Sequence, residues 1–392
     1  MTLRSLIGFA GIRRSTTFAG LFCLTALAQT LLLAVIPLEA LRLLSDVQLV
    51  SILYFGAGLV GFLGRLGVPS LTRIIRRPWM LTLGAATAIA SLPLLASDNT
   101  VGFALGLALN VLASTSIEVI LTLHVLDQIP RHELGKFEGK RLFFAAAPWT
   151  LGPWLGVYLH RDVAPWTPFA LAGATVIALL GSYWIFGSGT NAEVHSSRRA
   201  LRPALYLYRF FSQPRLRLAW ILAAGRSIWW NTFFIYAPIL AVTSGLGEQV
   251  GGAIVSVGQS WMWVIPLWAW LGRRFGLRRV LTLGYLCAGL LTLATVGLMG
   301  SPWLGAAMLL LATLAASTID GAGNSLFLRA VHPYERSEMT AVFVSYRDIT
   351  QIGPPALFSV LLSVFDLPAV FVASAVIMLA MTSLTRYIPY RF

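Results

Sequence analysis

The chain has 392 residues, of which 57% are hydrophobic and only 11% are charged, and its mean hydropathy is +0.77. These values lie far outside the range of soluble globular domains and indicate a membrane protein. The formal net charge of +14 would also suit a protein that binds nucleic acid. The positions of the basic residues along the chain distinguish nucleic-acid binding from membrane topology as the reason for this charge.

Charge-poor runs recur along the whole chain, and a helix needs roughly 20 apolar residues to cross the hydrocarbon core. In the first half the runs cover residues 15–38, 47–63, 78–97, 100–117, 142–159 and 163–188. In the second half they cover 218–242, 249–271, 280–319, 339–365 and 367–385. The run 280–319 is long enough for two helices and must fold back at Gly300-Ser301-Pro302. The sequence therefore predicts an all-α integral membrane protein with twelve transmembrane helices.

The basic residues lie mainly on one side of these spans. If both termini and the even-numbered loops share a side, 24 of the 29 Lys and Arg residues fall there. Arg42 and Arg161 fall on the other side, and the remaining three, Arg65, Arg226 and Arg347, fall within spans. This is the positive-inside asymmetry. It predicts a multi-pass protein of the bacterial inner (plasma) membrane with both termini cytoplasmic, and it accounts for the basic charge without a nucleic acid.

Landmarks of the first half return in the second half after a nearly constant interval. The interval is 201 residues for Pro37 and Pro238, for Arg77 and Arg278, and for Gly152-Pro153 and Gly353-Pro354, and 202 for Glu118 and Asp320. The sequence therefore predicts an N-terminal six-helix bundle (1–188), a cytoplasmic linker (189–217) and a C-terminal six-helix bundle (218–392). Each bundle has an even number of spans, so both should have the same orientation in the membrane. A short amphipathic surface helix is expected in the linker, through "LYLYRFF".

Two equivalent loops carry similar basic motifs. The loop after the second span contains Arg73, Arg76 and Arg77, and the loop after the eighth contains Arg274, Gly276 and Arg278. Together with the duplicated twelve-span architecture, they resemble the major facilitator superfamily, whose corresponding loop carries Gly-x-x-x-Asp-Arg-x-Gly-Arg-Arg. Thr72 and Arg273 stand where that pattern has its Asp. The motif could therefore serve transport, or its arginines could only anchor cytoplasmic loops.

The fifth span contains small residues and prolines at Gly139, Pro148, Gly152-Pro153 and Gly156. This spacing resembles the motif of drug–proton antiporters of the superfamily, although Pro148 and Val157 replace glycines of that motif. Small residues allow helices to approach closely, and Pro153 permits the bend that a rocking interface would need. The resemblance implies efflux, and the alternative is the general enrichment of Gly and Pro in membrane helices. The Arg that such exporters usually carry in the fourth span is absent here, so their coupling mechanism does not simply transfer.

In the superfamily, spans one, four, seven and ten line the central cavity. The resemblance implies substrate-cavity roles for the polar and aromatic residues of these spans, which are Gln29, Asn110, Ser114, Trp230, Asn231, Ser317 and Asn324. A carboxylate inside the membrane is costly and is by default a functional candidate. Glu118 and Asp320 are accordingly predicted to be protonation or cation sites, with Arg226 as the competing charge. The alternative is a gate latch, in which Lys140 or Arg141 pairs with Glu118, and Arg347 pairs with Asp320.

The sequence contains no phosphate-binding Gly-x-x-x-x-Gly-Lys-Ser/Thr loop and no catalytic or metal-ligand cluster, so we expect no enzyme activity, cofactor or metal. It favours a secondary active transporter, namely a monomeric, proton-coupled exporter of a small organic or amphipathic solute that works by alternating access. Two alternatives stay open. The chain could take up an anionic metabolite with Arg226 as the counter-charge, or it could be a transporter-like membrane sensor that moves nothing.

Overall fold

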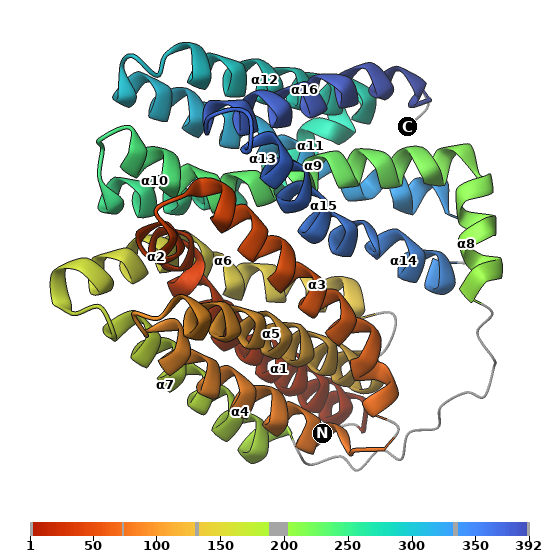
Figure 1. Ribbon diagram of the computed structural model, residues 1–392. Coiled ribbons are helices and arrows are strands. Elements are labelled where there is room, and N and C mark those ends of the chain that lie inside the picture. The colour runs from red at the N-terminus through yellow and green to blue at the C-terminus, as the bar shows by residue number, and fades with distance from the viewer. Residues whose placement is uncertain (1–2, 73, 130–132, 188–202, 332–335, 390–392) are drawn as a thin grey trace. The chain divides into compact units, whose positions relative to one another are not determined.

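A computed structural model describes residues 3–72, 74–129, 133–187, 203–331 and 336–389, and every regular element in these segments is a helix (Figure 1). The chain divides into two compact units. Unit 1 comprises Met1–Ser45 and Gly56–His195, and unit 2 comprises Asp46–Phe55 and Ser196–Phe392.

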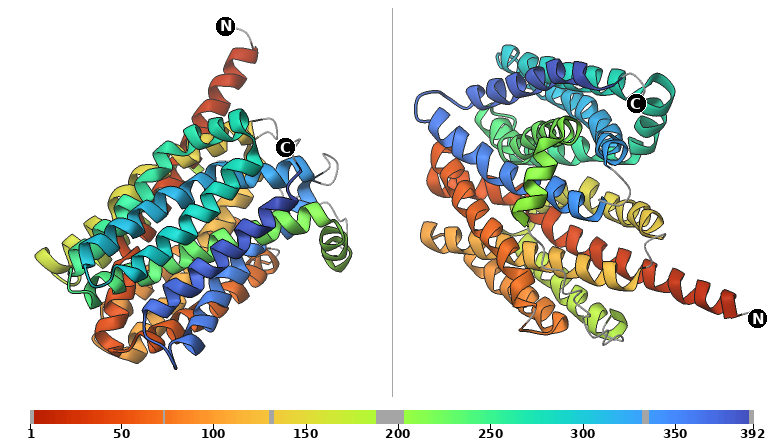
Figure 2. Two further views of the ribbon diagram at one scale, coloured as in Figure 1. Left: turned by 90° about the horizontal axis from the view of Figure 1, so that it is seen from above. Right: turned by 90° about the vertical axis from the view of Figure 1, so that its right-hand side faces the viewer.

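The helices of unit 1 are α1 (Leu3–Leu33), α2 (Val35–Leu44), α3 (Val47–Leu71), α4 (Arg77–Leu95), α5 (Thr100–Gln128), α6 (Leu134–Tyr158), η1 (Leu159–Val163), α7 (Thr167–Ser182) and η2 (Tyr183–Gly187). Helix α1 makes its most extensive contacts with α6 and α7 and also packs against α5, and α4 packs against α5 and α7. The first turns of α1 project beyond the other helices of the unit (Figure 2). The start of α3 groups with unit 2 and its remainder with unit 1.

The first expected span, 15–38, is divided into two helices. Helix α1 ends at Leu33 and α2 begins at Val35, with Ala34 between them in a turn. Pro37 explains the break because it has no N–H to donate to the carbonyl group of Leu33, four residues earlier. The expected first span is confirmed as one apolar helical run, Ser15–Leu44, with a one-residue turn at Ala34 between α1 and α2.

The helices of unit 2 are α8 (Pro203–Ser212), α9 (Pro214–Thr243), α10 (Glu248–Ser260), η3 (Trp261–Val264), α11 (Ile265–Phe275), α12 (Leu277–Gly297), α13 (Pro302–Ala330), α14 (Arg336–Val344), α15 (Tyr346–Leu361), α16 (Pro368–Leu384) and η4 (Thr385–Tyr387). Helices α9 and α13 contact each other and, between them, most of the other helices of the unit. Helix α9 packs against α10, α13, α15 and α16, and α12 packs against α13 and α16. The predicted linker helix is confirmed as α8, which buries Phe210 and runs across the ends of α9 and α14 (Figure 1).

Within the described segments, ten helical runs are long and apolar enough to cross a membrane. The two expected spans not among them are 218–242, which lies in α9, and 339–365, which is formed by α14 and α15. These are the spans interrupted by Arg226 and by Arg347-Asp348. The predicted reversal at Gly300-Ser301-Pro302 is confirmed, since α12 ends at Gly297 and α13 begins at Pro302. The prediction of an all-α integral membrane protein is thus confirmed.

Candidate functional site

A buried ion pair joins α9 to α13 inside unit 2. Arg226 Nε lies 3.3 Å from Asp320 Oδ1, and Trp230 Nε1 donates a 2.9 Å hydrogen bond to Asp320 Oδ2. Arg226 and Trp230 are one helical turn apart, so both side chains lie on the same face of α9. Each oxygen of the Asp320 carboxylate therefore has its own partner on α9, the guanidinium of Arg226 for Oδ1 and the indole N–H of Trp230 for Oδ2.

Tyr346 extends this cluster to α15. Its hydroxyl oxygen accepts hydrogen bonds from Arg226 Nη2 at 3.1 Å and from Arg347 Nε at 3.4 Å. The side chain of Arg226 is only 9% exposed and that of Asp320 is 28% exposed. A charge this deeply buried needs a partner, and Asp320 supplies it to Arg226. Gly323 leaves room for the guanidinium, because a Cβ atom there would lie 3.2 Å from Arg226 Nη1.

Three polar side chains of α13 accept hydrogen bonds from indole N–H groups. Trp261 donates to Thr313 at 3.1 Å, Trp268 donates to Ser317 at 3.0 Å, and Trp230 donates to Asp320 as described. Thr313 and Ser317 are buried. Ser317 was expected to line a substrate cavity, but in this structure its hydroxyl is packed against Trp268. The side chain of Asn324 lies outside the described residues.

Asn231 was also expected in the cavity. Its Nδ2 donates a 2.8 Å hydrogen bond to the carbonyl oxygen of Thr350, and the hydroxyls of Ser227 and Thr350 lie 2.6 Å apart. These bonds fasten α9 to α15 next to the ion pair. In this structure Asn231 thus fixes the position of the helices that carry Arg226 and Tyr346.

In unit 1, three of the predicted cavity residues do come together. Gln29, Asn110 and Ser114 line a cavity of about 30 Å³, together with Thr25 and apolar side chains of α1, α4, α5 and α7. Asn110 Nδ2 also donates to Ser91 Oγ at 3.2 Å. A volume of this size accommodates water, whereas sites for organic ligands measure hundreds of Å³. The cavity is therefore water-sized, and four polar side chains line it among eight apolar ones.

Glu118 is placed differently from its repeat partner Asp320. Its Oε2 lies 3.7 Å from Arg65 Nη2, and the two side chains are 42% and 22% exposed. Arg141, one of the two partners expected for Glu118 in a latch, pairs with Glu138 instead. The arginines that contact the two repeated acids therefore come from non-equivalent helices, α3 in unit 1 and α9 in unit 2.

The repeat offset explains this difference. An interval of 201 residues relates Thr25 to Arg226 and Gln29 to Trp230. The first copy thus has neutral side chains beside its water-sized cavity at the positions where the second copy has Arg226 and Trp230, the two partners of Asp320. At these positions of the repeat, the ion pair with a buried arginine is found in unit 2 and has no counterpart at Thr25 and Gln29 of unit 1.

We expect the substitution Glu118→Gln to lower the free energy of unfolding by less than about 1 kcal/mol, because half-exposed pairs contribute little. Thermal unfolding of purified protein measures this. Arg65→Gln is the matched variant and should have an effect of the same small size. A loss of several kcal/mol in either variant would contradict the loose pairing described above.

The basic loop motif of the first copy gains an acid from elsewhere in the fold. Arg77 forms an ion pair with Asp127 and approaches the carbonyl oxygen of Leu123 at 3.5 Å. Asp127 on α5 thus provides a carboxylate that the loop itself lacks at Thr72. Arg76 is exposed just before α4, and Arg73 lies outside the described residues.

In the second copy, Gly276 separates α11 from α12 with φ +90°, a conformation that favours glycine. The guanidinium of Arg274 lies 5.2 Å from the ring centre of Trp270. Arg278 lies in the first turn of α12. The positive φ at Gly276 therefore explains why the family pattern has a glycine here.

The glycines of the fifth span pack against α1 within unit 1. A Cβ atom at Gly152 would collide with Thr30, and one at Gly156 would collide with the backbone carbonyl of Leu31. Pro153 lies between them inside α6, and all three residues are buried. In this structure the motif therefore serves close contact between α1 and α6.

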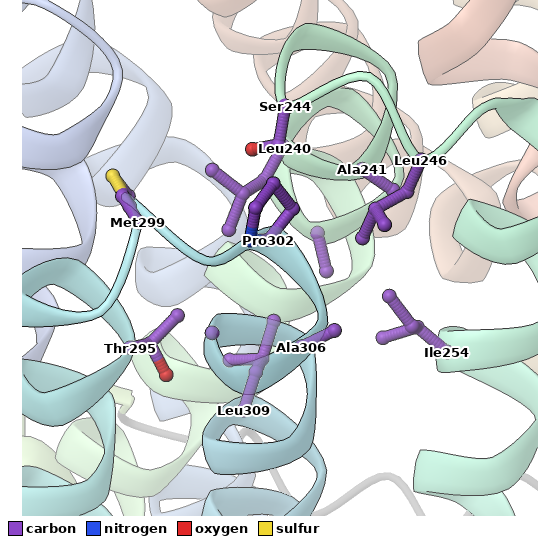
Figure 3. A pocket seen from close by; sticks show the side chains of 12 residues that line it. Leu240, Ala241, Ser244, Leu246, Ile254, Thr295, Met299, Pro302, Ala306 and Leu309 are labelled. Atoms are coloured by element: carbon purple, nitrogen blue, oxygen red, sulfur yellow. The ribbon is translucent and has the colours of Figure 1, made fainter.

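A second cavity lies inside unit 2 and is smaller, at about 10 Å³ (Figure 3). Its lining residues come from α9, α10, α12, α13 and the adjoining turns, and only Ser244 and Thr295 among them are polar. It has neither the size nor the polar groups to hold an organic solute, so the ion-pair cluster remains the candidate site.

Several residues that contact the predicted site residues were missed by reasoning from sequence. Tyr346 and Trp268 were not singled out, and Arg65 was recognised only as a charge within a span. Tyr346 stands directly before Arg347 at the start of an interrupted span, which is a usable signal. Trp268 gives no such signal, because tryptophans are common in membrane helices and its contact with Ser317 depends on the packing of α11 against α13.

Comparison with known proteins agrees with the expected family. The family model of the Major Facilitator Superfamily matches residues 18–352. No curated protein sequence is significantly similar to the chain. Among solved structures, a mutant of the nucleoside transporter NupG has a TM-score of 0.74 at 12% identity, with 95% of this chain and 98% of that chain covered. A POT family transporter in complex with 5-aminolevulinic acid has a TM-score of 0.70 at 13% identity, with 93% and 94% covered.

The structural matches show the shared fold, and at such low identity they do not transfer a substrate or a direction of transport. The family model spans most of the sequence, including both groups of helices. The chain therefore belongs to the major facilitator superfamily, and it is a membrane transporter of small molecules rather than an enzyme.

Proposed function

We propose that this protein is a secondary active transporter that couples proton movement to the export of a small organic or amphipathic solute. The observation that carries the proposal is the Arg226–Asp320 ion pair, in which a partly buried carboxylate contacts one buried arginine and one indole N–H. Protonation of Asp320 would remove the charge that holds Arg226. The pair therefore offers a proton-dependent change of contacts between α9 and α13, which is what coupling requires.

Glu118 is the second proton site of the proposal, with a different role. Its partner Arg65 is farther away and both side chains are more exposed, so protonation there disturbs fewer contacts. We place the principal coupling step at Asp320 and a supporting step at Glu118. The resemblance of the fifth span to drug–proton antiporters supports export. The positive-inside asymmetry supports an inner-membrane location with cytoplasmic termini.

The first test measures lumenal pH in proteoliposomes while lipophilic cations, neutral drugs and organic anions are added in turn. We expect a cation or a neutral compound to move protons through wild-type protein, Asp320→Asn to reduce this flux to background, and Glu118→Gln to reduce it partly. Asp366→Asn is the matched control, because Asp366 is an exposed acid outside the cluster and its loss should leave the flux unchanged. Wild-type proton flux through Asp320→Asn would refute the proposal.

A second candidate function is uptake of an anionic metabolite, and the convergence of Arg226 and Arg347 on Tyr346 favours it. In this case a substrate carboxylate would replace Asp320 as the partner of Arg226. Arg226 is occupied by Asp320 in this structure, which is why we rank this function second. Proton flux that only carboxylate-bearing compounds elicit, and that the charge-neutral double variant Arg226→Gln/Asp320→Asn abolishes, would favour uptake of an anion.

A further inference from the structure

A second group of titratable side chains lies at the end of unit 1 that contains α2. Glu39 on α2 has a side chain that is only 9% exposed, and both of its oxygens are engaged. Oε2 lies 2.7 Å from Arg42 Nη2, and Oε1 lies 2.7 Å from His160 Nε2 in η1, whose side chain is 15% exposed. Glu39 is thus a buried carboxylate bridging a histidine and an arginine.

The contacts continue from Arg42 to the turn between α4 and α5. Arg42 Nη2 lies 2.6 Å from Asp98 Oδ1. The four side chains form a row in the order His160, Glu39, Arg42, Asp98, and they link η1, α2 and the α4–α5 turn. All three segments belong to unit 1.

The charge of this row depends on His160. Glu39 and Asp98 contribute two negative charges and Arg42 one positive charge, so a proton on His160 makes the row alternate in sign and sum to zero. The neighbours of His160 in η1, Arg161 and Asp162, are both exposed. From α7, an apolar ring faces the histidine, that of Phe169 at 6.3 Å between ring centres. Histidine is the side chain that ordinarily takes up a proton near neutral pH.

The His160 side of the contact lies on π-helical backbone, and the Glu39 side lies in the short α-helix α2. Helix α2 follows the break that Pro37 imposes on the first span, and η1 is a π-helical turn at the end of α6. Such π-helical turns are often found at functional sites. Segment η1 follows directly on α6, and α2 follows α1 after the turn at Ala34, so the His160–Glu39 contact links the short segments that end these two helices.

We propose that His160 and Glu39 form a proton-binding site, separate from Asp320 and Glu118, that holds α2 against η1 when it is occupied. The site lies at the end of unit 1 that carries Arg42 and Arg161, the two arginines assigned to the less basic side of the membrane. The proposal deepens the proton-coupled function and rests on it for its effect on transport. Proton binding itself can be measured without any transported solute.

The test is the apparent melting temperature of the purified full-length protein at about pH 5.5 and about pH 8, on either side of the ordinary histidine range. We expect the wild type to melt at a lower temperature at the higher pH. His160 then loses its proton, so the row carries a net negative charge and the attraction between His160 and Glu39 weakens. His160→Gln and Glu39→Gln should each remove this difference. His124→Gln is the matched control, since it also removes a buried histidine, which contacts Tyr183 and the carbonyl of Ile120, and it should keep the wild-type difference.

A permanently charged variant covers the case in which the glutamine variants do not fold. His160→Lys should melt at the same temperature at both pH values, because its charge does not depend on the proton. A wild-type pH difference in His160→Gln or in His160→Lys would overturn the proposal. These outcomes are independent of the proton-flux assay, since retained coupling in Asp320→Asn would refute the proposed function and leave the stability result unchanged.

Discussion

Neutralising Asp320 alone should destabilise the protein more than neutralising Asp320 and Arg226 together. Asp320→Asn leaves the guanidinium of Arg226 buried, with the hydroxyl of Tyr346 as its remaining partner in the cluster. Breaking a buried pair from one side costs about 3–5 kcal/mol, because an uncompensated charge stays behind. Removing both charges avoids this penalty. Thermal unfolding of the two single variants and of Arg226→Gln/Asp320→Asn measures the effect.

Asp366→Asn again serves as the control and should unfold like the wild type. The double variant decides the interpretation, because two side chains that act as a unit have non-additive effects. If the losses of the two single variants simply add in the double variant, the ion pair does not form in the protein, and the site would have to be sought elsewhere.

Replacing Gly156 by alanine should also have a large effect, through backbone geometry rather than charge. A Cβ atom at this position would overlap the carbonyl oxygen of Leu31, and backbone cannot move aside as a flexible side chain can. Helices α1 and α6 would have to separate. Inserting atoms into a well-packed contact typically costs about 1–3 kcal/mol and occasionally more, and we expect a loss at the upper end. Thermal unfolding and the yield of monodisperse protein measure it.

The same helix offers a matched control at Gly139, where an added Cβ would meet nothing within 4 Å. Gly139→Ala should be neutral or slightly stabilising, since alanine favours the helix by about 1 kcal/mol over glycine. If Gly156→Ala and Gly139→Ala had the same melting temperature, this result would contradict the close approach of α1 and α6. The comparison separates a packing role of the fifth-span motif from a general tolerance of small residues in membrane helices.

The two copies of the repeated acid have diverged in the contacts that they make. Glu118 and Asp320 are equivalent by their spacing in the sequence, yet one is loosely paired and the other is firmly held. The partner decides the difference, since Arg226 and Trp230 correspond to Thr25 and Gln29 in the first copy. A repeat can therefore keep an acid in both copies while its chemistry diverges through the neighbouring helix.

The sequence by itself determined the membrane class, the helical architecture, most span positions and the family, because these follow from hydropathy, helix length and the spacing of glycines, prolines and arginines along the chain. It also found Glu118, Asp320 and Arg226, since a charge in an apolar run is visible without a structure. The tertiary structure alone decided which groups meet. Asp320 contacts Arg226 and Trp230, Asp127 supplies the acid missing from the loop motif, and Glu39 contacts His160. Each of these contacts joins separate helices, and which helices pack together depends on the fit of their side chains over the whole bundle rather than on a local pattern.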